Sequence, residues 1–283
     1  MKNQMALRSK LLVLAIIAIL VLIQACEKSE TTMPEENSPE IPPASSFIMD
    51  FSDFSSSDTS NLSLGFYKEP GENLSYRNWW WAAINVGVWN TILTVTLIVP
   101  TAAFLESFNH TPVQQPDGSW LWTYNFTAAG VVHTAKLRGS INNNGTTWEM
   151  RITKPGFYQD FLWYTGQANL FLTNGSWALN KDPNEPEPFL DIQWNRNPQD
   201  STADIKYINV IPGHPDSSGY IFYGVTTDTT FDAFYDIYSK SHNNTINIQW
   251  NRISKAGRVK DPLHFGDPDW HCWDEQLLDT ICP

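Results

Sequence analysis

The chain has 283 residues, with 30 Asp and Glu against 18 Lys and Arg, a net charge of −12 and a pI near 4.8. A chain of this charge is repelled by phosphate backbones, so nucleic acid is excluded as a partner. The length suits one large β domain or two small ones once the N-terminal segments described below are set aside.

The first 25 residues have the three parts of an export signal. Lys2, Arg8 and Lys10 precede an apolar run over residues 11–23, and the small residue Ala25 precedes a break. The run is shorter than the roughly 20 residues that a stable membrane span requires. We therefore predict a cleaved signal peptide over residues 1–25. An ordinary secretory signal and an uncleaved anchor remain alternatives.

The end of this segment, Ile23-Gln24-Ala25-Cys26, resembles the lipobox of bacterial lipoproteins. The resemblance implies cleavage before Cys26 and transfer of a diacylglycerol to its sulfur, with further acyl chains such as palmitate on the same residue. The next residues, Glu27-Lys28-Ser29-Glu30, resemble the acidic export tag of lipoproteins of the Bacteroidota. The resemblance therefore implies a protein anchored to the outer membrane by lipid, on its periplasmic or cell-surface face, with the membrane as its partner.

Residues 26–46 are predicted to be the lipidated cysteine followed by a disordered tether. The stretch is rich in Pro, Ser and Glu and has no aromatic residue, so it offers little surface to bury. Its prolines favour an extended stalk. Removal of residues 1–25 leaves 15 Lys and Arg against 30 acids, a net charge of −15. The rest, residues 47–283, is predicted to be a single β-rich domain.

Residues 79–105 contain no charged side chain. Asn78 is suited to cap a helix and Pro100 to end or kink one, so we predict a buried apolar helix over about residues 79–99, with or without a strand after it. A membrane span and a pair of strands are the alternatives. Polar residues near the middle argue against the span, and a lipid anchor would make it redundant.

From about residue 107 the hydrophobic residues alternate with period 2, as in half-buried strands. Short links rich in Asn, Gly, Asp and Pro separate the segments, and no helical pattern intervenes. The predicted strands are 119–127, 131–141, 146–153, 160–172, 190–197, 203–210, 219–226, 231–239 and 245–254. The pattern predicts a mainly β fold: an antiparallel meander curled into an open or closed barrel around the apolar helical segment.

The chain has 13 tryptophans. Tryptophan rings bind sugars, but they also fill curled sheets and stack across strands. Trp79, Trp80 and Trp81 cannot all point the same way on a helix, so they are the candidate ligand-binding residues. A glycine followed closely by tryptophan recurs at Gly118, Gly145 and Gly175, which is compatible with duplication of a hairpin or with common use of good strand residues.

Polar residues concentrate in the loop 261–275. Its candidate metal ligands are His264, Asp267, Asp269 and His271, since a loop can bring imidazoles and carboxylates together around a divalent ion. No metal motif of known spacing is complete. The alternative is a loop shaped by proline with its acids in water, held by a disulfide between Cys272 and Cys282, which an oxidising compartment favours.

The sequence contains no nucleophile elbow, P-loop or dinucleotide fingerprint. We therefore expect a non-enzymatic binding module of the cell envelope that takes a hydrophobic, glycan or protein ligand. The alternatives are a metal-dependent hydrolase that uses the 261–275 loop and a structural component of an envelope complex. No cofactor is expected, and a divalent metal is left open.

Overall fold

The computed structural model describes residues 37–54 and 75–282, so the predicted signal peptide and the proposed lipidation site, Cys26, lie outside the described residues. Residues Ser38–Pro283 cluster as one compact unit. Every core residue within the described ranges belongs to this unit.

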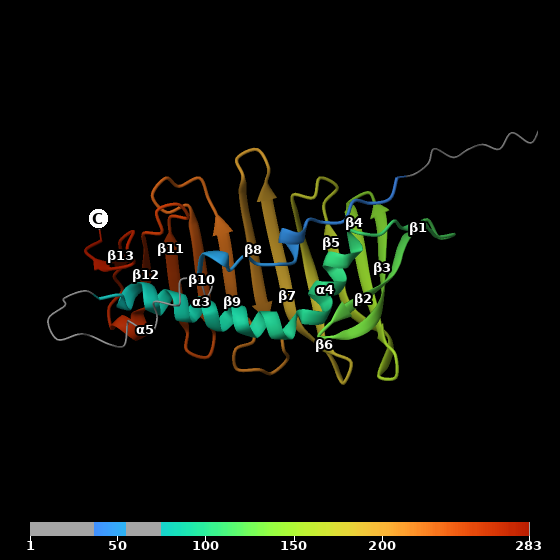
Figure 1. The fold of residues 1–283 in the computed structure, drawn as a ribbon, viewed down its shortest axis with the longest axis horizontal. Coiled ribbons are helices and arrows are strands. Elements are labelled where there is room, and N and C mark those ends of the chain that lie inside the picture. Colours follow the sequence, from blue (N-terminus) through green and yellow to red (C-terminus); the bar gives the residue numbers. More distant parts are fainter. Residues whose placement is uncertain (1–36, 55–74, 283) are drawn as a thin grey trace, which may run out of the picture. The chain divides into compact units, whose positions relative to one another are not determined.

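The unit is built on one antiparallel sheet of 14 strands, in which each strand pairs with its neighbours in the sequence. The strands are β1 (Val113–Gln114), β2 (Trp120–Ala128), β3 (Val131–Asn142), β4 (Gly145–Lys154), β5 (Tyr158–Ala168), β6 (Asn174–Asp182), β7 (Glu185–Asn197), β8 (Thr202–Asn209), β9 (Tyr220–Val225), β10 (Ala233–Ser239), β11 (Asn244–Trp250), β12 (Gly257–Lys260), β13 (His271–Trp273) and β14 (Asp279–Thr280). The order begins at β1 and ends at β14 without a pairing between them, so the predicted meander is confirmed and its sheet is open (Figure 1).

One face of the sheet is apolar and forms the core. On β2, for example, Trp122, Tyr124 and Phe126 are buried, whereas the intervening Thr123 and Asn125 are exposed. This is the alternation expected of an antiparallel sheet with one face packed and one face in water. The sheet therefore has an inner face, which carries the core, and an outer face, which carries mainly polar residues.

Several tryptophans lie opposite a glycine on the neighbouring strand. Trp148 pairs with both Gly139 and Gly166, and a Cβ on Gly166 would come within 2.1 Å of the ring of Trp177. Similar cross-strand pairs are Gly166–Trp177, Gly175–Trp194 and Gly257–Trp273. The ring of each tryptophan occupies the space that a side chain at the glycine would need, which is a known way to cover a glycine in a sheet.

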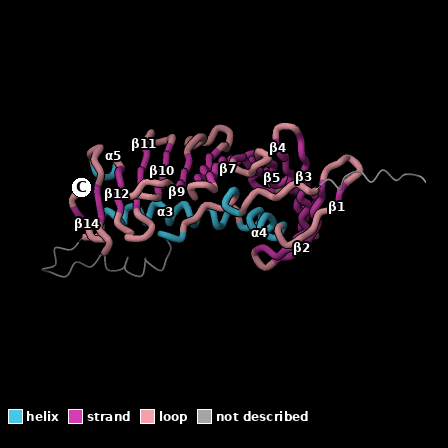
Figure 2. The backbone as a smooth tube through the Cα atoms, turned by 90° about the horizontal axis from the view of Figure 1, so that it is seen from above, coloured by secondary structure: helices cyan, strands magenta, loops and turns pink. Residues whose placement is uncertain are grey.

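Two helices cross the inner face. α3 (Arg77–Thr96) and α4 (Ile98–Ser107) meet at a bend of 72° at Leu97. α3 contacts β12, β13 and β14, and α4 contacts β2, so the pair runs from one end of the sheet to the other (Figures 1 and 2). The helical prediction for residues 79–99 is confirmed, but the helical region is longer, and a second helix follows in place of the optional strand.

Pro100 is the third residue of α4, and the bend at Leu97 lies three residues before it, so the predicted kink is confirmed and the predicted helix end is not. The peptide N–H that proline lacks has no partner within the helix at that position, so proline is tolerated there. Leu97 is the C-cap of α3 and the N-cap of α4, and it is buried. No single helix among the described residues is long and apolar enough to cross a membrane; only the bent pair passes that test of length and composition.

Residues 38–54, here called the strap, also lie on the inner face. The strap contains the short helical turns η2 (Ala44–Ser46) and η3 (Ser52–Phe54). Pro39, Pro42 and Ser46 are buried. The expectation of a disordered tether up to residue 46 therefore fails for residues 38–46, because the sheet supplies the apolar surface that this proline-rich stretch lacks by itself.

Candidate apolar binding surface

The strap is held by polar atoms at the tips of the inner-face aromatic residues. Trp177 Nε1 on β6 donates to Ser46 Oγ at 3.3 Å, and Trp250 Nε1 on β11 donates to Asp53 Oδ2 at 3.1 Å. Between them, the hydroxyl of Tyr235 on β10 donates to the carbonyl of Asp50. The strap thus crosses the strands in their order and is fixed at several points along its length.

The bend between α3 and α4, here called the elbow, lies next to the strap. The N–H of Leu97 donates to Leu93 O at 2.8 Å and closes the last turn of α3, and the N–H of Thr101 donates to Leu97 O at 2.9 Å and begins the first turn of α4. Phe104 of α4 stacks on Phe47 of the strap, with ring centroids 4.8 Å apart. The strap and the elbow therefore pack together over the sheet.

A groove of about 330 Å³ opens between the strap and the elbow. Its lining is mostly aliphatic and carries no charge: Ile48, Met49, Phe51, Asn90, Leu93, Thr94, Leu97, Ile98, Thr101, Ala102, Leu105 and Tyr207. The volume is at the lower end of the range for small-molecule sites. A lining of this kind suits an apolar ligand, such as one acyl chain.

The side of α3 and α4 that faces away from the sheet is also aliphatic. The exposed aliphatic side chains of α3 recur every three or four residues and so share one side of that helix, and α4 adds Ile98 and Leu105 beyond the bend. We call this set the aliphatic stripe: Ile84, Val88, Ile92, Val95, Ile98 and Leu105. Ile98 and Leu105 also line the groove, so the stripe and the groove are one continuous apolar surface.

The predicted ligand-binding tryptophans lie at the start of α3. Trp79 is buried, and Trp80 is half-buried against the core. Trp81 donates from Nε1 to Asp261 Oδ2 at 3.0 Å, and its ring stacks on that of His264 with centroids 3.6 Å apart. The structure thus places these rings in packing contacts. Trp81 also lines a hollow of about 420 Å³ together with His264 and Asp261.

The predicted metal ligands do not converge. Asp267 accepts from His271 Nε2 at 3.0 Å, and the His271 ring stacks on Phe265. The backbone N–H of Asp269 and the His271 imidazole lower the pKa of Asp267, whereas burial lowers the pKa of His264. Among the described residues, no group of three or more His, Cys, Asp or Glu is arranged to hold a metal ion.

Asp261 is the buried acidic residue of this loop, and its carboxylate bonds several neighbouring elements. Its side chain caps α5 (Pro262–Phe265) by accepting from the N–H groups of Leu263 and His264, and it also accepts from Asn244 Nδ2 at 2.8 Å and from Trp81. Each oxygen of the carboxylate therefore has a partner. This role follows from the Asp-Pro start of a helix, a signal that was present in the sequence.

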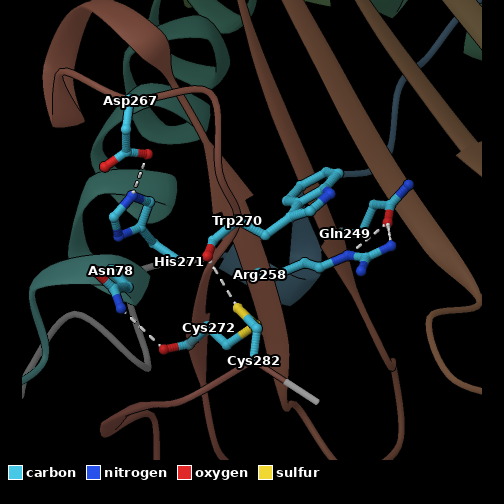
Figure 3. The surroundings of a disulfide bond; sticks show 8 residues. All are labelled: Asn78, Gln249, Arg258, Asp267, Trp270, His271, Cys272 and Cys282. Atoms are coloured by element: carbon cyan, nitrogen blue, oxygen red, sulfur yellow. Dashed lines mark hydrogen bonds and ion pairs between the residues drawn. A yellow bond between two sulfur atoms is a disulfide. The ribbon is translucent and has the colours of Figure 1, made fainter.

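The predicted disulfide between Cys272 and Cys282 is confirmed, with the two Cα atoms 5.2 Å apart. Figure 3 shows it beside the start of α3, where Asn78 Nδ2 donates to Cys272 O at 2.9 Å. The backbone N–H of Asn78 donates to Asp279 Oδ1 at 2.9 Å, so a carboxylate from the tail caps the helix in place of Asn78 itself. The tail thereby fixes one end of α3.

One serine, histidine and aspartate come together on the surface near β10, but not as a catalytic relay. Ser239 Oγ contacts His242 Nδ1 at 2.9 Å and donates to Asp216 Oδ1 at 3.1 Å. A triad needs the imidazole between the carboxylate and the hydroxyl, so that it can take the hydroxyl proton. Here the hydroxyl lies between the other two groups, and the cluster stabilises a turn.

The outer face carries a shallow depression of about 780 Å³ over β4 to β7. Thr147, Gln167, Ser176 and Gln193 form a row on adjacent strands. Their side chains make no hydrogen bond within the described part of the chain, and no residue that lines the depression is charged. Sequence reasoning missed this row, because the register that aligns its residues is not visible before the strands are paired.

A second cluster on the outer face combines aromatic rings with cations. The guanidinium of Arg258 lies 4.3 Å from the ring centroid of Trp270 and 4.6 Å from that of Phe231, and it also donates to Gln249 Oε1 (Figure 3). Lys206 Nζ lies 3.6 Å from the ring centroid of Tyr220. These contacts cover aromatic residues that the outer face would otherwise expose.

No family model, no curated protein and no solved structure matches this chain.

Proposed function

We propose that this chain is a lipid-anchored lipoprotein of the bacterial cell envelope, and that its sheet unit is a non-enzymatic binding module for an apolar ligand. The lipobox-like Ile23-Gln24-Ala25-Cys26 supports the anchor. The observation that carries the binding proposal is the uncharged groove between the strap and the elbow. An acyl chain or an apolar peptide would replace water there without stranding a buried charge.

The strap keeps this groove formed. Tyr207 on β8 lines the groove and bonds the strap through its hydroxyl, and the strap in turn packs on α4 through Phe47. A largely formed pocket loses less conformational freedom on binding than a surface that must first assemble. This favours binding at the elbow over a site that would require the helices to move away from the sheet.

The test is titration of palmitate into the chain from residue 27 onward, followed by native mass spectrometry. This chain keeps the whole compact unit and lacks the acyl anchor. We expect one palmitate per chain, and we expect Ala102→Trp to abolish binding, because the indole would fill the groove that Ala102 lines. Ala178→Trp, at an exposed position on β6, is the matched control and should bind normally. Binding by Ala102→Trp at the wild-type level would overturn the proposal.

A second candidate ligand is a neutral glycan on the outer face. Its support is the uncharged row Thr147, Gln167, Ser176 and Gln193, whose amides and hydroxyls are free to bond sugar hydroxyls. The test is a titration with neutral oligosaccharides such as cellopentaose. We expect Gln167→Ala with Gln193→Ala to abolish any binding, and Ala102→Trp to leave it unchanged. No binding by the wild-type chain would remove this candidate.

A further inference from the structure

The aliphatic stripe is unusual for the outward side of a helix. From Asn78 to Leu105 the chain carries neither an acidic nor a basic side chain, although a helix on a domain surface normally presents charges to water. Val95 is 70% exposed, Val88 52% and Ile92 50%. A contiguous apolar surface of this kind marks a site of interaction.

The polar groups beside the stripe are already satisfied within the helix. Thr91 Oγ1 donates to Gly87 O at 2.9 Å, and Thr96 Oγ1 donates to Ile92 O at 2.6 Å. Thr94 Oγ1 donates to Asn90 Oδ1 at 3.1 Å. These bonds pair all three hydroxyl donors, so an apolar environment could cover this side of α3 without leaving one of them unpaired.

The size of the stripe argues against a second copy of the chain as its partner. α3 has 20 residues and α4 has 10, so together they are about 45 Å long and about 10 Å wide. One side of them therefore offers roughly 450 Å² per copy, or roughly 900 Å² for a symmetric pair. That is below the ~1,000 Å² that a specific protein interface needs. A lipid surface has no such minimum when another part of the chain is already attached to it.

The proposed lipid anchor would supply that attachment. Residues 27–37 separate Cys26 from the start of the compact unit, a reach of at most about 40 Å. The helices lie on one side of the sheet only, and the other side is its mainly polar outer face (Figure 2). A helix that lies in a membrane interface usually has a polar face of its own, which stays in water. Here the outer face of the sheet is the polar side that stays in water.

We infer that the aliphatic stripe is a membrane contact: α3 lies along the lipid surface, and the groove opens beside the acyl chains. This inference rests on the proposed function for the identity of the groove ligand and for delivery to the bilayer. With a net charge of −15 after loss of residues 1–25, the chain is repelled by anionic lipid, so the contact is apolar and insensitive to salt.

The test is sedimentation of the chain from residue 27 onward with phosphatidylcholine vesicles, at low and at high salt. We expect the wild-type chain to sediment at both, and we expect Val88→Lys with Val95→Lys to lower the vesicle-bound fraction at least tenfold. The matched control is Val113→Lys with Val132→Lys, two valines that are 65% and 57% exposed on β1 and β3, which should sediment as the wild type does. Lysine favours a helix more than valine, so the stripe variant should fold, and thermal unfolding verifies this.

Three outcomes of the vesicle experiment would overturn the inference. They are failure of the wild-type chain to sediment, sedimentation unaffected by the stripe substitutions, and sedimentation that high salt abolishes. A dimer in sedimentation equilibrium without lipid, lost in the stripe variant, would assign the stripe to a second copy and overturn it as well. Failure here differs from failure of the groove, because Ala102→Trp should keep vesicle binding while it loses palmitate, and the stripe variant should do the reverse.

Discussion

Tyr207 and Phe47 are joined across 160 residues of sequence by a buried hydrogen bond. The hydroxyl of Tyr207 donates to Phe47 O at 2.7 Å and accepts from the N–H of Met49 at 3.0 Å. One phenol thus satisfies both a donor and an acceptor of the strap. Because burial disfavours the phenolate, the pKa of Tyr207 is raised, and the hydroxyl keeps the proton that it donates.

We therefore expect Tyr207→Phe to lower the free energy of unfolding by about 1–3 kcal/mol, the cost of leaving buried backbone groups unpaired. Urea denaturation measures the change. Tyr164→Phe is the matched control, since Tyr164 is equally buried but its hydroxyl has no partner within the described residues. Its removal should raise stability by about 1 kcal/mol. Equal losses in the two variants would show that the phenol contacts the strap only by packing.

Buried tyrosines, Tyr207 and Tyr164 among them, lower the stability of the fold at alkaline pH. Burial raises the pKa values of Tyr164, Tyr207 and Tyr235 above their ordinary range, so the folded chain holds protons that the unfolded chain releases above pH ~10. Their contribution to stability is complete below that pH and is lost as the pH rises further. Above that pH, each of these tyrosines lowers the free energy of unfolding by about 1.4 kcal/mol per pH unit.

Urea midpoints recorded from pH 8 upward would test this prediction, and they should be flat until about pH 9 and then fall steeply. Tyr164→Phe should make the fall of stability with pH less steep by the contribution of one tyrosine, because the variant has no phenolic proton at this position to release on unfolding. A fall that begins near neutral pH would require another titrating group and would contradict the assignment.

The order of the strands was predictable because the links between them are short and each strand has one solvent-exposed face and one buried face. Nine segments could be read from period 2, and all nine overlap strands of the sheet. β6 was not predicted. Its residues lie between two segments rich in turn-forming residues, and the strand predicted over residues 160–172 runs past the end of β5 into the loop before β6. β1, β12, β13 and β14 have two to four residues, too few to show a period, and neighbouring strands and the disulfide hold them in place.

The groove was beyond sequence reasoning for a different reason. It joins the strap to the elbow. Residues 38–46 have the composition of a tether and were misjudged alone, whereas Pro100 left open whether the helix ends or bends there. The conformation of both segments depends on their packing against the sheet, which the sequence of either segment does not show. The tryptophan pattern was likewise ambiguous, because the glycine that matters to Trp177 is Gly166 across the sheet and not Gly175, its neighbour in the sequence.

The cross-strand pair Gly166–Trp177 gives a direct test of this packing. A Cβ at Gly166 would lie 2.1 Å from the Trp177 ring, so Gly166→Ala should destabilise the fold by about 1–3 kcal/mol through overpacking. Gly87→Ala is the control, because a Cβ at Gly87 on α3 meets nothing within 4 Å. It should stabilise the chain by about 0.5–1 kcal/mol. A neutral Gly166→Ala would mean that the ring can move aside and that the pair does not fix the sheet.

The disulfide offers the last prediction, on how the tail supports α3. The bond closes a short loop with a sequence separation of 10, for which chain entropy predicts a loss of about 3 kcal/mol when it is removed. We expect Cys272→Ser with Cys282→Ser to show a loss of that order in urea denaturation. Asp279→Ala keeps the disulfide and removes only the carboxylate that accepts from the N–H of Asn78, so it should cost about 1 kcal/mol.

Hydrogen exchange separates the two contributions of the tail. In Asp279→Ala the amides in the first turn of α3 should exchange faster, and those of β13 should be unchanged. In the double serine variant both sets should exchange faster, because only the short β13–β14 pairing, without the covalent link, then holds the strand that carries Asp279. Unchanged exchange in the first turn of α3 in both variants would show that the contact with the sheet alone fixes this end of the helix.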